Sequence, residues 1–420
     1  MFLRKLVLQN FKCLSKLELN FEVTPTANRQ WTLLLGENGT GKSNLLKAIA
    51  LITCGSNALG EIIGNTDSWI ALGKKSCTIR AWLTTKKGEE RELALEIRRG
   101  DSLSRLIAKN QQALQLIDDA IDNAERNYFT VAYGASRRLV SDNVGATGYA
   151  EAGRYGSRVG NIRNLFDGGA TLHPLAAWIM DLDYQDGEAG LTIIREALNS
   201  FLPGISFHSI DKRQKQVLFE TSDGLVPLEH LSDGYQNMAA WIGDLLFRIT
   251  ETFRDRREPL HARGLLLLDE IDLHLHPKWQ RLLYDFVSAK LPNFQVVATT
   301  HSALTAQQAG ENELFALRRN ARHVVELIPF IGSPQQLLVN QLLMSPMFDI
   351  ATDESREVET AKQQYTQLKA QGKSLTAAEK RELAAVSSRL VEIRPQRNMP
   401  LVADPEMKLL QRIEASLNAQ

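Results

Sequence analysis

The chain has 420 residues, of which 44% are hydrophobic and 23% charged, so it can bury a sizeable core and is not intrinsically disordered. Its 49 basic and 49 acidic residues cancel, which excludes a polybasic coat protein but not a local basic patch for DNA or RNA. Three widely spaced cysteines form neither a metal pattern nor a disulfide framework, so we expect a cytoplasmic protein. No apolar run approaches the ~18 residues that span a bilayer, so we expect no membrane partner.

The early part of the chain is predicted to be rich in strands. Its first twelve residues contain short apolar pieces broken by charges, which is typical of a strand rather than a signal peptide. Leu17, Leu19 and Phe21 alternate with polar residues, as in a half-buried strand. Further strands are predicted over residues 31–35, 76–83, 92–98 and 129–133, with a turn at Lys87 and Gly88.

The middle of the chain combines a loop with a helix. Residues 141–169 contain seven glycines and several arginines, and they are predicted to form an exposed loop. Residues 170–202 are predicted to be mainly helical.

The second half regains a strong periodicity. Apolar residues recur at helical spacing from Met238 to Ile249, and Gly264–Leu268 is a wholly apolar, buried strand. Pro277 opens another helix, and a buried strand follows at 295–299.

The composition changes after about residue 335. Residues 354–391 are charged and helical, with a capping box formed by Thr376 and Glu379. We therefore expect a head over residues 1–335 and a C-terminal helical region over 336–420. That region is either an arm for assembly or effector docking, or a solvated pair of helices.

A P-loop pattern occupies residues 36–43. Its residues are Gly36, Glu37, Asn38, Gly39, Thr40, Gly41, Lys42 and Ser43. The glycines let backbone amides surround phosphates, Lys42 supplies a positive charge, and Ser43 offers a hydroxyl to Mg²⁺. The strand before the pattern and the apolar helix after it favour a nucleotide site over a chance glycine-rich turn. We therefore expect ATP and Mg²⁺ as cofactors.

An acidic pair follows the apolar strand at Leu265–Leu268. Asp269 is predicted to hold Mg²⁺ and Glu270 to orient or deprotonate the attacking water, as in a Walker B element. The simpler alternative is an acidic strand end, and the upstream P-loop favours the catalytic interpretation.

Two weaker signals accompany these motifs. Leu231–Gln236 reads LSDGYQ at the start of a helix, where Ser232 and Gly234 can form an anion site or Ser232 can be an ordinary N-cap. His301 follows a buried strand, where it either bonds a γ-phosphate or is a capping or packing residue.

In this order and spacing, the four motifs resemble the ABC-type ATPases, including SMC, RecF and OLD-like heads, over residues 1 to about 330. The resemblance implies an α/β fold: a P-loop α/β core with an antiparallel β subdomain, a helical insertion and a C-terminal helical region. It also implies a head-to-head dimer, in which ATP lies between the P-loop of one chain and Ser232 and Gly234 of the other.

The same resemblance assigns further roles. Glu270 would be the catalytic base, His301 the switch histidine, and Asp272 part of a loop that crosses the dimer seam. The sequence Asn10-Phe11-Lys12 also resembles the start of such heads, which would place Lys12 near the nucleotide.

The sequence departs from the family pattern in two places. Asp233 replaces the first glycine of the signature, and no glutamine is obvious for the Q-loop, for which Gln111, Gln112 and Gln115 are candidates. Both departures concern the coupling of dimerisation to hydrolysis.

A narrower resemblance rests on Tyr133–Arg138, on LSDGYQ and on the run Leu268–Pro277. These resemble the AAA ATPases of phage-defence operons, in particular the Septu and retron-associated PtuA ATPases, which work with a separate HNH nuclease. An OLD-type nuclease would need an Asp-x-Asp pair near the C-terminus, and after residue 310 only Asp349, Asp353 and Asp404 occur. The pair Asp181 and Asp183 is predicted to lie on a helix surface.

We therefore expect a Mg²⁺-dependent regulatory ATPase of a phage-defence complex, which forms a dimer or higher oligomer and controls an HNH nuclease supplied in trans. The alternatives are a RecF-like repair or recombination ATPase that binds DNA itself, and a nucleotide-gated scaffold with negligible turnover.

Overall fold

The computed structural model describes residues 2–24, 27–85, 88–122, 129–137, 157–214, 216–253, 258–348, 350, 352, 354–370 and 376–393. Contacts divide the chain into two compact units, Met1–Asp349 and Ile350–Gln420. Helix α11 (Val339–Leu343) packs against α10 (Ala303–Ala306) within the first unit, although the composition changes earlier, near residue 335.

The first unit is built on a six-stranded sheet with the order β15-β14-β5-β13-β12-β8. All neighbours in it are parallel except β15, which is an antiparallel edge strand. The strands are β5 (Trp31–Gly36), β8 (Thr130–Tyr133), β12 (Gly264–Leu268), β13 (Phe294–Thr299), β14 (Leu314–Arg319) and β15 (Val325–Pro329). Every residue of β12 and β13 is buried, as expected for strands covered on both faces.

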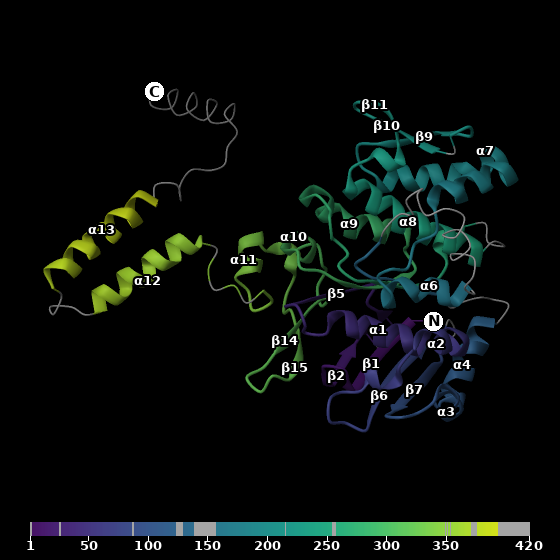
Figure 1. Ribbon diagram of the computed structural model, residues 1–420, viewed down its shortest axis with the longest axis horizontal. Helices are drawn as coiled ribbons and strands as arrows, with labels where there is room; N and C mark the ends of the chain where they lie inside the picture. The colour runs from purple at the N-terminus through teal and green to yellow at the C-terminus, as the bar shows by residue number, and fades with distance from the viewer. Residues whose placement is uncertain are drawn as a thin grey trace. The chain divides into compact units, whose positions relative to one another are not determined.

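Side chains alternate between the two faces of this sheet and so contribute to two separate cores. Leu34 and Leu267 belong to one core, whereas Leu33 and Leu268 belong to the other. Figure 1 shows the two blocks of secondary structure that cover the faces, one around β1, β2 and α1 and one around α7 and α8.

The first block is an antiparallel sheet of order β2-β1-β6-β7 with α1 packed on it. Leu17 and Leu19 are buried while their neighbours are exposed, so the alternation predicts this strand correctly. The block contains β1 (Phe2–Phe11), β2 (Leu14–Asn20), β3 (Glu22–Thr24), β4 (Ala27–Asn28), β6 (Ser76–Thr84), β7 (Glu90–Arg98), α1 (Lys42–Thr53), α2 (Gly55–Ile62), α3 (Leu103–Lys109), α4 (Gln111–Asp122) and α6 (Ser157–Phe166).

The second block covers the other face with helices and a small antiparallel sheet of order β11-β10-β9. Its helix α8 buries Met238, Trp241, Ile242, Leu245 and Ile249, the residues whose spacing predicted it. The block contains α7 (Leu175–Phe201), β9 (Ser206–Asp211), β10 (Gln216–Thr221), β11 (Gly224–Pro227), α8 (Asp233–Thr252) and α9 (Pro277–Lys290).

The prediction of a loop over residues 141–169 is wrong for residues 157–166, whereas residues 167–169 do form a turn. Residues 157–166 form α6, which buries Val159, Ile162 and Leu165 at helical spacing. The prediction failed because it relied on the high glycine content and overlooked this short amphipathic pattern. The earlier part of the predicted loop, and Lys87 of the predicted turn, lie outside the described residues.

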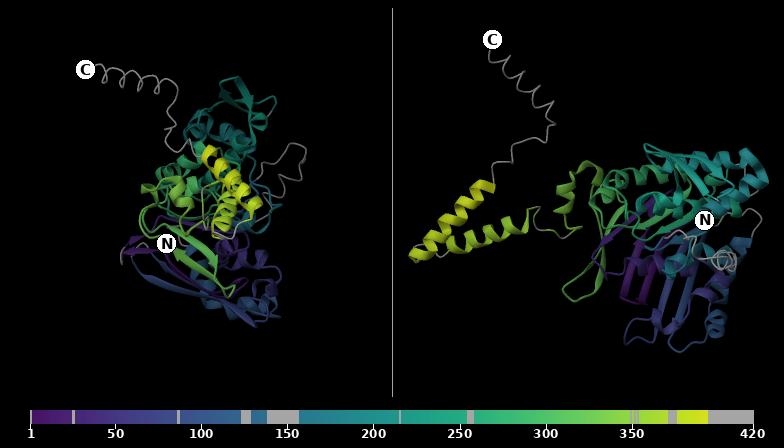
Figure 2. Two further views of the ribbon diagram at one scale, coloured as in Figure 1. Left: turned by 90° about the vertical axis from the view of Figure 1, so that its left-hand side faces the viewer. Right: turned by 45° about the horizontal axis from the view of Figure 1, so that its top comes forward.

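The second unit contains α12 (Arg356–Ala370) and α13 (Ala377–Ile393), which pack against each other and carry an ion pair between Glu357 and Arg389 (Figure 2). The capping box is confirmed, because Thr376 N–H donates to the Glu379 carboxylate at 2.7 Å and Glu379 N–H donates to the Thr376 hydroxyl at 3.3 Å. Among the helices of the described ranges, none combines the length and the apolar character needed to cross a membrane.

Candidate functional site

The P-loop connects the carboxyl end of β5 to the start of α1. The backbone φ angles of Gly36, Gly39 and Gly41 are 147°, 79° and 100°, values that residues other than glycine rarely adopt. A Cβ on Gly41 would lie 2.7 Å from Cys13 Sγ, so the close packing of this loop also requires glycine. In the described part of the chain, no side chain caps the first amides of α1, which therefore face the loop as an anion site.

Lys42 reaches back across this loop. Its Nζ donates to the carbonyls of Gly36 at 2.7 Å and Glu37 at 3.0 Å, and the side chain is 6% exposed. Burial lowers the pKa of Lys42, and the charges of Asp269 and Glu270 oppose that shift. The amine is therefore fixed against the loop carbonyls and lies within the electrostatic influence of the two acidic residues.

A pocket of about 190 Å³ opens beside the loop. Its wall includes Gly36, Glu37 and Thr40 of the P-loop, His301 after β13, and Arg319 at the end of β14. Arg319 Nη2 donates to the Gly39 carbonyl at 3.0 Å, which ties the tip of the P-loop to the next strand of the sheet. No motif of the sequence singles out Arg319.

The Walker B pair lies at the carboxyl end of β12. Asp269 is 8% exposed and its Oδ1 accepts a 2.7 Å hydrogen bond from the Thr299 hydroxyl, which ends the neighbouring strand β13. The same hydroxyl accepts from Glu270 N–H at 2.7 Å. Glu270 has φ of 47°, so this turn holds a non-glycine residue in the left-handed region.

Asp272 follows this pair and is directed inward. Its carboxylate accepts hydrogen bonds from Thr300 at 2.8 Å and Thr305 at 3.2 Å, and the residue is 8% exposed. Asp272 therefore braces the loops after β12 and β13 within its own chain.

His301 lies next to the P-loop pocket rather than at a helix cap. Ser302, not His301, caps α10 by accepting from Leu304 N–H at 3.1 Å. Partial desolvation and the nearby Lys42 charge lower the pKa of His301, so the ring is held neutral at pH 7. A neutral imidazole can exchange a hydrogen bond with a phosphate oxygen at this position.

The LSDGYQ turn starts α8 with Ser232 at the N-cap position, but within the described ranges its hydroxyl caps nothing and remains exposed. A Cβ on Gly234 would lie 3.2 Å from the His274 carbonyl, so the turn packs closely on the loop after Walker B. Gln236 Nε2 donates to the Leu231 carbonyl at 2.7 Å and fixes the turn from inside. This turn and the P-loop line different pockets.

The remaining sequence candidates do not line the P-loop pocket, although Cys13, next to Lys12, packs on Gly41 of the P-loop. Gln111, Gln112 and Gln115 are exposed on α4, where Gln115 bonds Asp119. Lys12 lies over the Trp69 ring, with its Nζ 4.3 Å from the centroid. Burial, followed by the charge of Lys47, lowers the pKa of Lys12.

Asp183 and His276 have structural partners in the second block. Asp183 on α7 pairs with Lys212 at 2.5 Å, and His276 caps α9 by accepting from Lys278 N–H at 3.2 Å.

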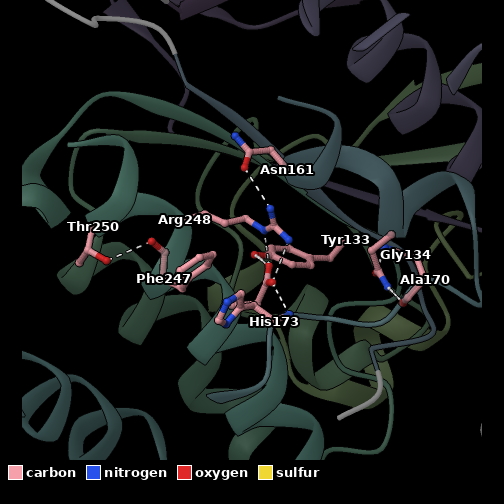
Figure 3. Close-up of polar contacts among 10 residues, drawn as sticks. Tyr133, Gly134, Asn161, Ala170, His173, Phe247, Arg248 and Thr250 are labelled. Atoms are coloured by element: carbon pink, nitrogen blue, oxygen red, sulfur yellow. Dashed lines mark hydrogen bonds and ion pairs between the residues drawn. The ribbon is translucent and has the colours of Figure 1, made fainter. Parts of the chain in front are cut away.

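A buried polar network links the sheet to α8 (Figure 3). Asp244 is fully buried and accepts from the Tyr133 hydroxyl at 2.7 Å, from Arg248 Nε at 2.5 Å and from His173 N–H at 2.8 Å. Arg248 also donates to Asn161 of α6 at 3.2 Å. The network therefore joins β8, α6, the start of α7 and α8, and the sequence motifs gave no indication of it.

These residues fit ATP with Mg²⁺. The uncapped amides of α1 and the Lys42 amine suit phosphate oxygens, while the Ser43 hydroxyl and the Asp269 carboxylate suit a hard cation. Within the described ranges no cluster of three or more His, Cys, Asp or Glu could hold a metal by itself. Mg²⁺ in phosphate-transfer sites is held by few protein ligands together with the substrate phosphates.

Two family models match the chain. One, described as "AAA domain, putative AbiEii toxin, Type IV TA system", matches residues 92–306, slightly more than half of the chain. The other, described as "AAA domain", matches residues 5–138.

Among curated relatives, the Septu protein PtuA of Bacillus mycoides is 25% identical over 83% of this chain and 45% of that protein. The chain thus spans about half the length of that relative. The retron Vc95 probable ATPase of Vibrio cholerae is 23% identical over 72% of this chain and 70% of that protein. A shorter match, to the RecF protein of Rickettsia canadensis, is 35% identical over 21% of this chain and 22% of that protein.

A solved structure of an SMC head bound to the C-winged helix domain of ScpA is 15% identical to this chain, with a TM-score of 0.45. It covers 79% of this chain and 98% of that one.

Proposed function

The chain belongs to the family of AAA domains described as a putative AbiEii toxin of type IV toxin–antitoxin systems, and is an ABC-type ATPase related to the Septu and retron ATPases. From this premise we propose that it is the Mg²⁺-dependent regulatory ATPase of a bacterial phage-defence complex in the cytoplasm. The observation that supports this most directly is the similarity to Septu PtuA across 83% of the chain.

In this proposal the P-loop amides and Lys42 bind the phosphates, and Ser43 with Asp269 holds Mg²⁺, which stabilises the charge that develops on the transferred phosphoryl group. Glu270 orients the attacking water and accepts its proton. His301 bonds the γ-phosphate as a neutral ring, in accord with its lowered pKa. The position of Lys42 against the loop carbonyls and within the electrostatic influence of the acidic pair supports these roles.

The active form is proposed to be a head-to-head dimer. Ser232 is exposed and its hydroxyl caps no helix in the described ranges, so it is available to a phosphate of a second chain. Because the LSDGYQ turn and the P-loop line separate pockets, one chain alone does not bring them to the same nucleotide. Two-fold symmetry would pair each P-loop with the turn of the partner.

The nuclease is proposed to be a separate HNH protein. The only aspartates after residue 310 are Asp349, Asp353 and Asp404, too far apart in the sequence to form an Asp-x-Asp pair. The unit Ile350–Gln420, which contains α12 and α13, is the proposed arm for assembly or nuclease docking.

The test is protection against phage. The chain and its operon neighbour should reduce plaque formation when expressed together, and neither should do so alone. Lys42→Ala and Glu270→Gln should each abolish protection, while Lys16→Ala, on the exposed face of β2, should leave it intact. Full protection by the Lys42→Ala pair would refute a role for ATP in defence.

A RecF-like role, favoured by the short match to RecF, makes a different prediction. In that case the isolated chain should hydrolyse ATP faster when DNA is added, without any protein partner. If the protein is instead a scaffold with negligible turnover, the Glu270→Gln variant should protect against phage as well as the wild-type protein does.

A further inference from the structure

Glu270 occupies a backbone conformation that its side chain does not favour. Its φ of 47° lies in the left-handed region, where an ordinary residue is strained and persists only if its surroundings hold it. Such strain often marks a functional site. The contacts that hold this backbone therefore bear on where the carboxylate points.

Two side chains bond the backbone of Glu270 from either side. The Thr299 hydroxyl accepts from its N–H at 2.7 Å. Arg137 Nη2 donates to the Glu270 carbonyl and, at 3.1 Å, to the carbonyl of Asp269. The peptide group before Glu270 is thus bonded by both Thr299 and Arg137, and the peptide group after it by Arg137.

Arg137 is itself held in place. It follows β8, and Asn164 of α6 fixes the intervening turn by accepting from Gly134 N–H at 2.9 Å and donating to the Ser136 carbonyl at 2.9 Å. A Cβ on Gly134 would lie 2.7 Å from the Asn164 carbonyl, so this close approach requires glycine. The guanidinium also lies 5.9 Å from the centroid of the Trp241 ring on α8.

Packing alone does not explain an arginine at this position. The residue is 4% exposed, and its Nη1 has no hydrogen-bond partner within the described ranges. Burial lowers the pKa of Arg137 to about 10, opposed by the charges of Asp269, Asp272 and Glu270, so it stays a cation at pH 7. A buried charge whose Nη1 makes no hydrogen bond costs folding free energy. We therefore attribute the presence of arginine here to the bonds that its Nη2 makes to the two carbonyls.

We propose that Arg137 is a positioning residue for catalysis: by bonding the carbonyls of Asp269 and Glu270, it holds Glu270 in the left-handed conformation that directs its carboxylate at the attacking water. Arg137 acts through Glu270: it does not line the P-loop pocket of its own chain, but lines the pocket beside the LSDGYQ turn. The inference rests on the proposed role of Glu270 as the catalytic base.

The test is a double-mutant cycle between residues 137 and 270, measured by single-turnover hydrolysis of labelled ATP. Arg137→Lys keeps the charge, but its side chain is shorter and lacks the planar guanidinium that places Nη2 against both carbonyls. This replacement should lower the hydrolysis rate about tenfold or more, because a small displacement of a catalytic group slows the reaction strongly. The affinity for ATP, measured by calorimetry, should stay unchanged. In the Glu270→Gln background, the same replacement should change the rate less than twofold.

Two further variants keep the result interpretable. Arg137→Gln removes the buried charge and serves if Arg137→Lys does not fold, with the same expected pattern. Arg158→Lys, a half-buried arginine that pairs with Asp118 at 2.9 Å, is the matched control and should leave the rate unchanged in both backgrounds.

The outcomes separate the two claims. Equal fold-losses in the wild-type and Glu270→Gln backgrounds, or a parallel fall in melting temperature and ATP affinity with no fall in rate, would overturn the role of Arg137 and leave that of Glu270 standing. A Glu270→Gln enzyme with the wild-type rate would overturn the catalytic role of Glu270, and this inference with it.

Discussion

The hydroxyl of Tyr133 donates a 2.7 Å hydrogen bond to the fully buried carboxylate of Asp244. Tyr133 ends β8, beside the Walker B strand, whereas Asp244 lies within the helix that starts at the LSDGYQ turn. The same carboxylate bonds Arg248 and the backbone of His173. A rotation of α8 relative to the sheet must therefore break these bonds or move their partners with it.

Replacements in this network should destabilise the fold in a definite order. Tyr133→Phe removes one of several bonds to Asp244 and should cost about 1–3 kcal/mol of unfolding free energy. Asp244→Ala leaves the Arg248 charge buried and unpaired and should cost about 3–5 kcal/mol. Urea denaturation measures both, with the exposed Thr192→Ala on α7 as the control, expected within about 0.5 kcal/mol of wild type. A Tyr133→Phe cost equal to that of Asp244→Ala would contradict this account.

Lys42→Ala should weaken ATP binding. The variant loses a charged donor to the phosphates, an interaction of about 1.5–3 kcal/mol, or roughly 10- to 150-fold in affinity. Isothermal calorimetry measures the change, circular dichroism checks the fold, and Lys16→Ala is the control. Wild-type affinity in a folded Lys42→Ala protein would remove the P-loop assignment.

A shared site predicts complementation between two inactive variants. Ser232→Arg should block the partner's site without a loss of helix capping, because no capping bond of Ser232 is present among the described residues. Mixed with Lys42→Ala, it can form dimers with one intact site, so a 1:1 mixture should recover about a quarter of wild-type activity if sites act independently. If exchange of chains is verified by mass and no activity returns, the two residues do not share a site.

The lowered pKa of His301 predicts a pH dependence. As pH falls, the unfolded state takes up the proton near pH 6.5 and the folded state only at a lower pH. Stability should therefore fall as pH drops below about 6.5. ATP hydrolysis should also be lost there if the neutral ring is required. The hydrolysis rate and the urea midpoint are measured as functions of pH for the wild type and for His301→Asn. If the two proteins give the same pH profiles, His301 does not have this role.

Deletion of the second unit should separate nucleotide binding from assembly. Removing residues 350–420 takes away α12 and α13 but none of the nucleotide-site residues, so ATP affinity should be preserved. Native mass spectrometry should show a smaller oligomer or loss of the co-expressed nuclease. An unchanged complex would identify α12 and α13 as a solvated pair of helices.

The sequence predicts the elements of the sheet well because their signals are local. The apolar run Gly264–Leu268 and the alternation of Leu17 and Leu19 report burial directly. The P-loop glycines likewise predict their own backbone, because a positive φ is a property of one residue. Whether Ser232 acts on a second chain stays a prediction.

The contacts between distant segments could not be predicted in this way. Arg137 is 132 positions from Asp269, and only the pairing of β8 with β12 brings the two together. The helix α6 was concealed because glycines surround its few apolar residues.

Because Cys13 packs against Gly41, a label attached to this cysteine would lie next to the P-loop. Burial raises the pKa of Cys54 and of Cys77 to about 12, so neither thiol forms the reactive thiolate readily. Cys13 is partly exposed. Its sulfur packs so closely on Gly41 that a Cβ added to this glycine would lie only 2.7 Å from it. A fluorophore attached through maleimide would therefore report on movement of this loop in the natural sequence, with no engineered cysteine, and its bulk would itself disturb the backbone that surrounds the phosphates.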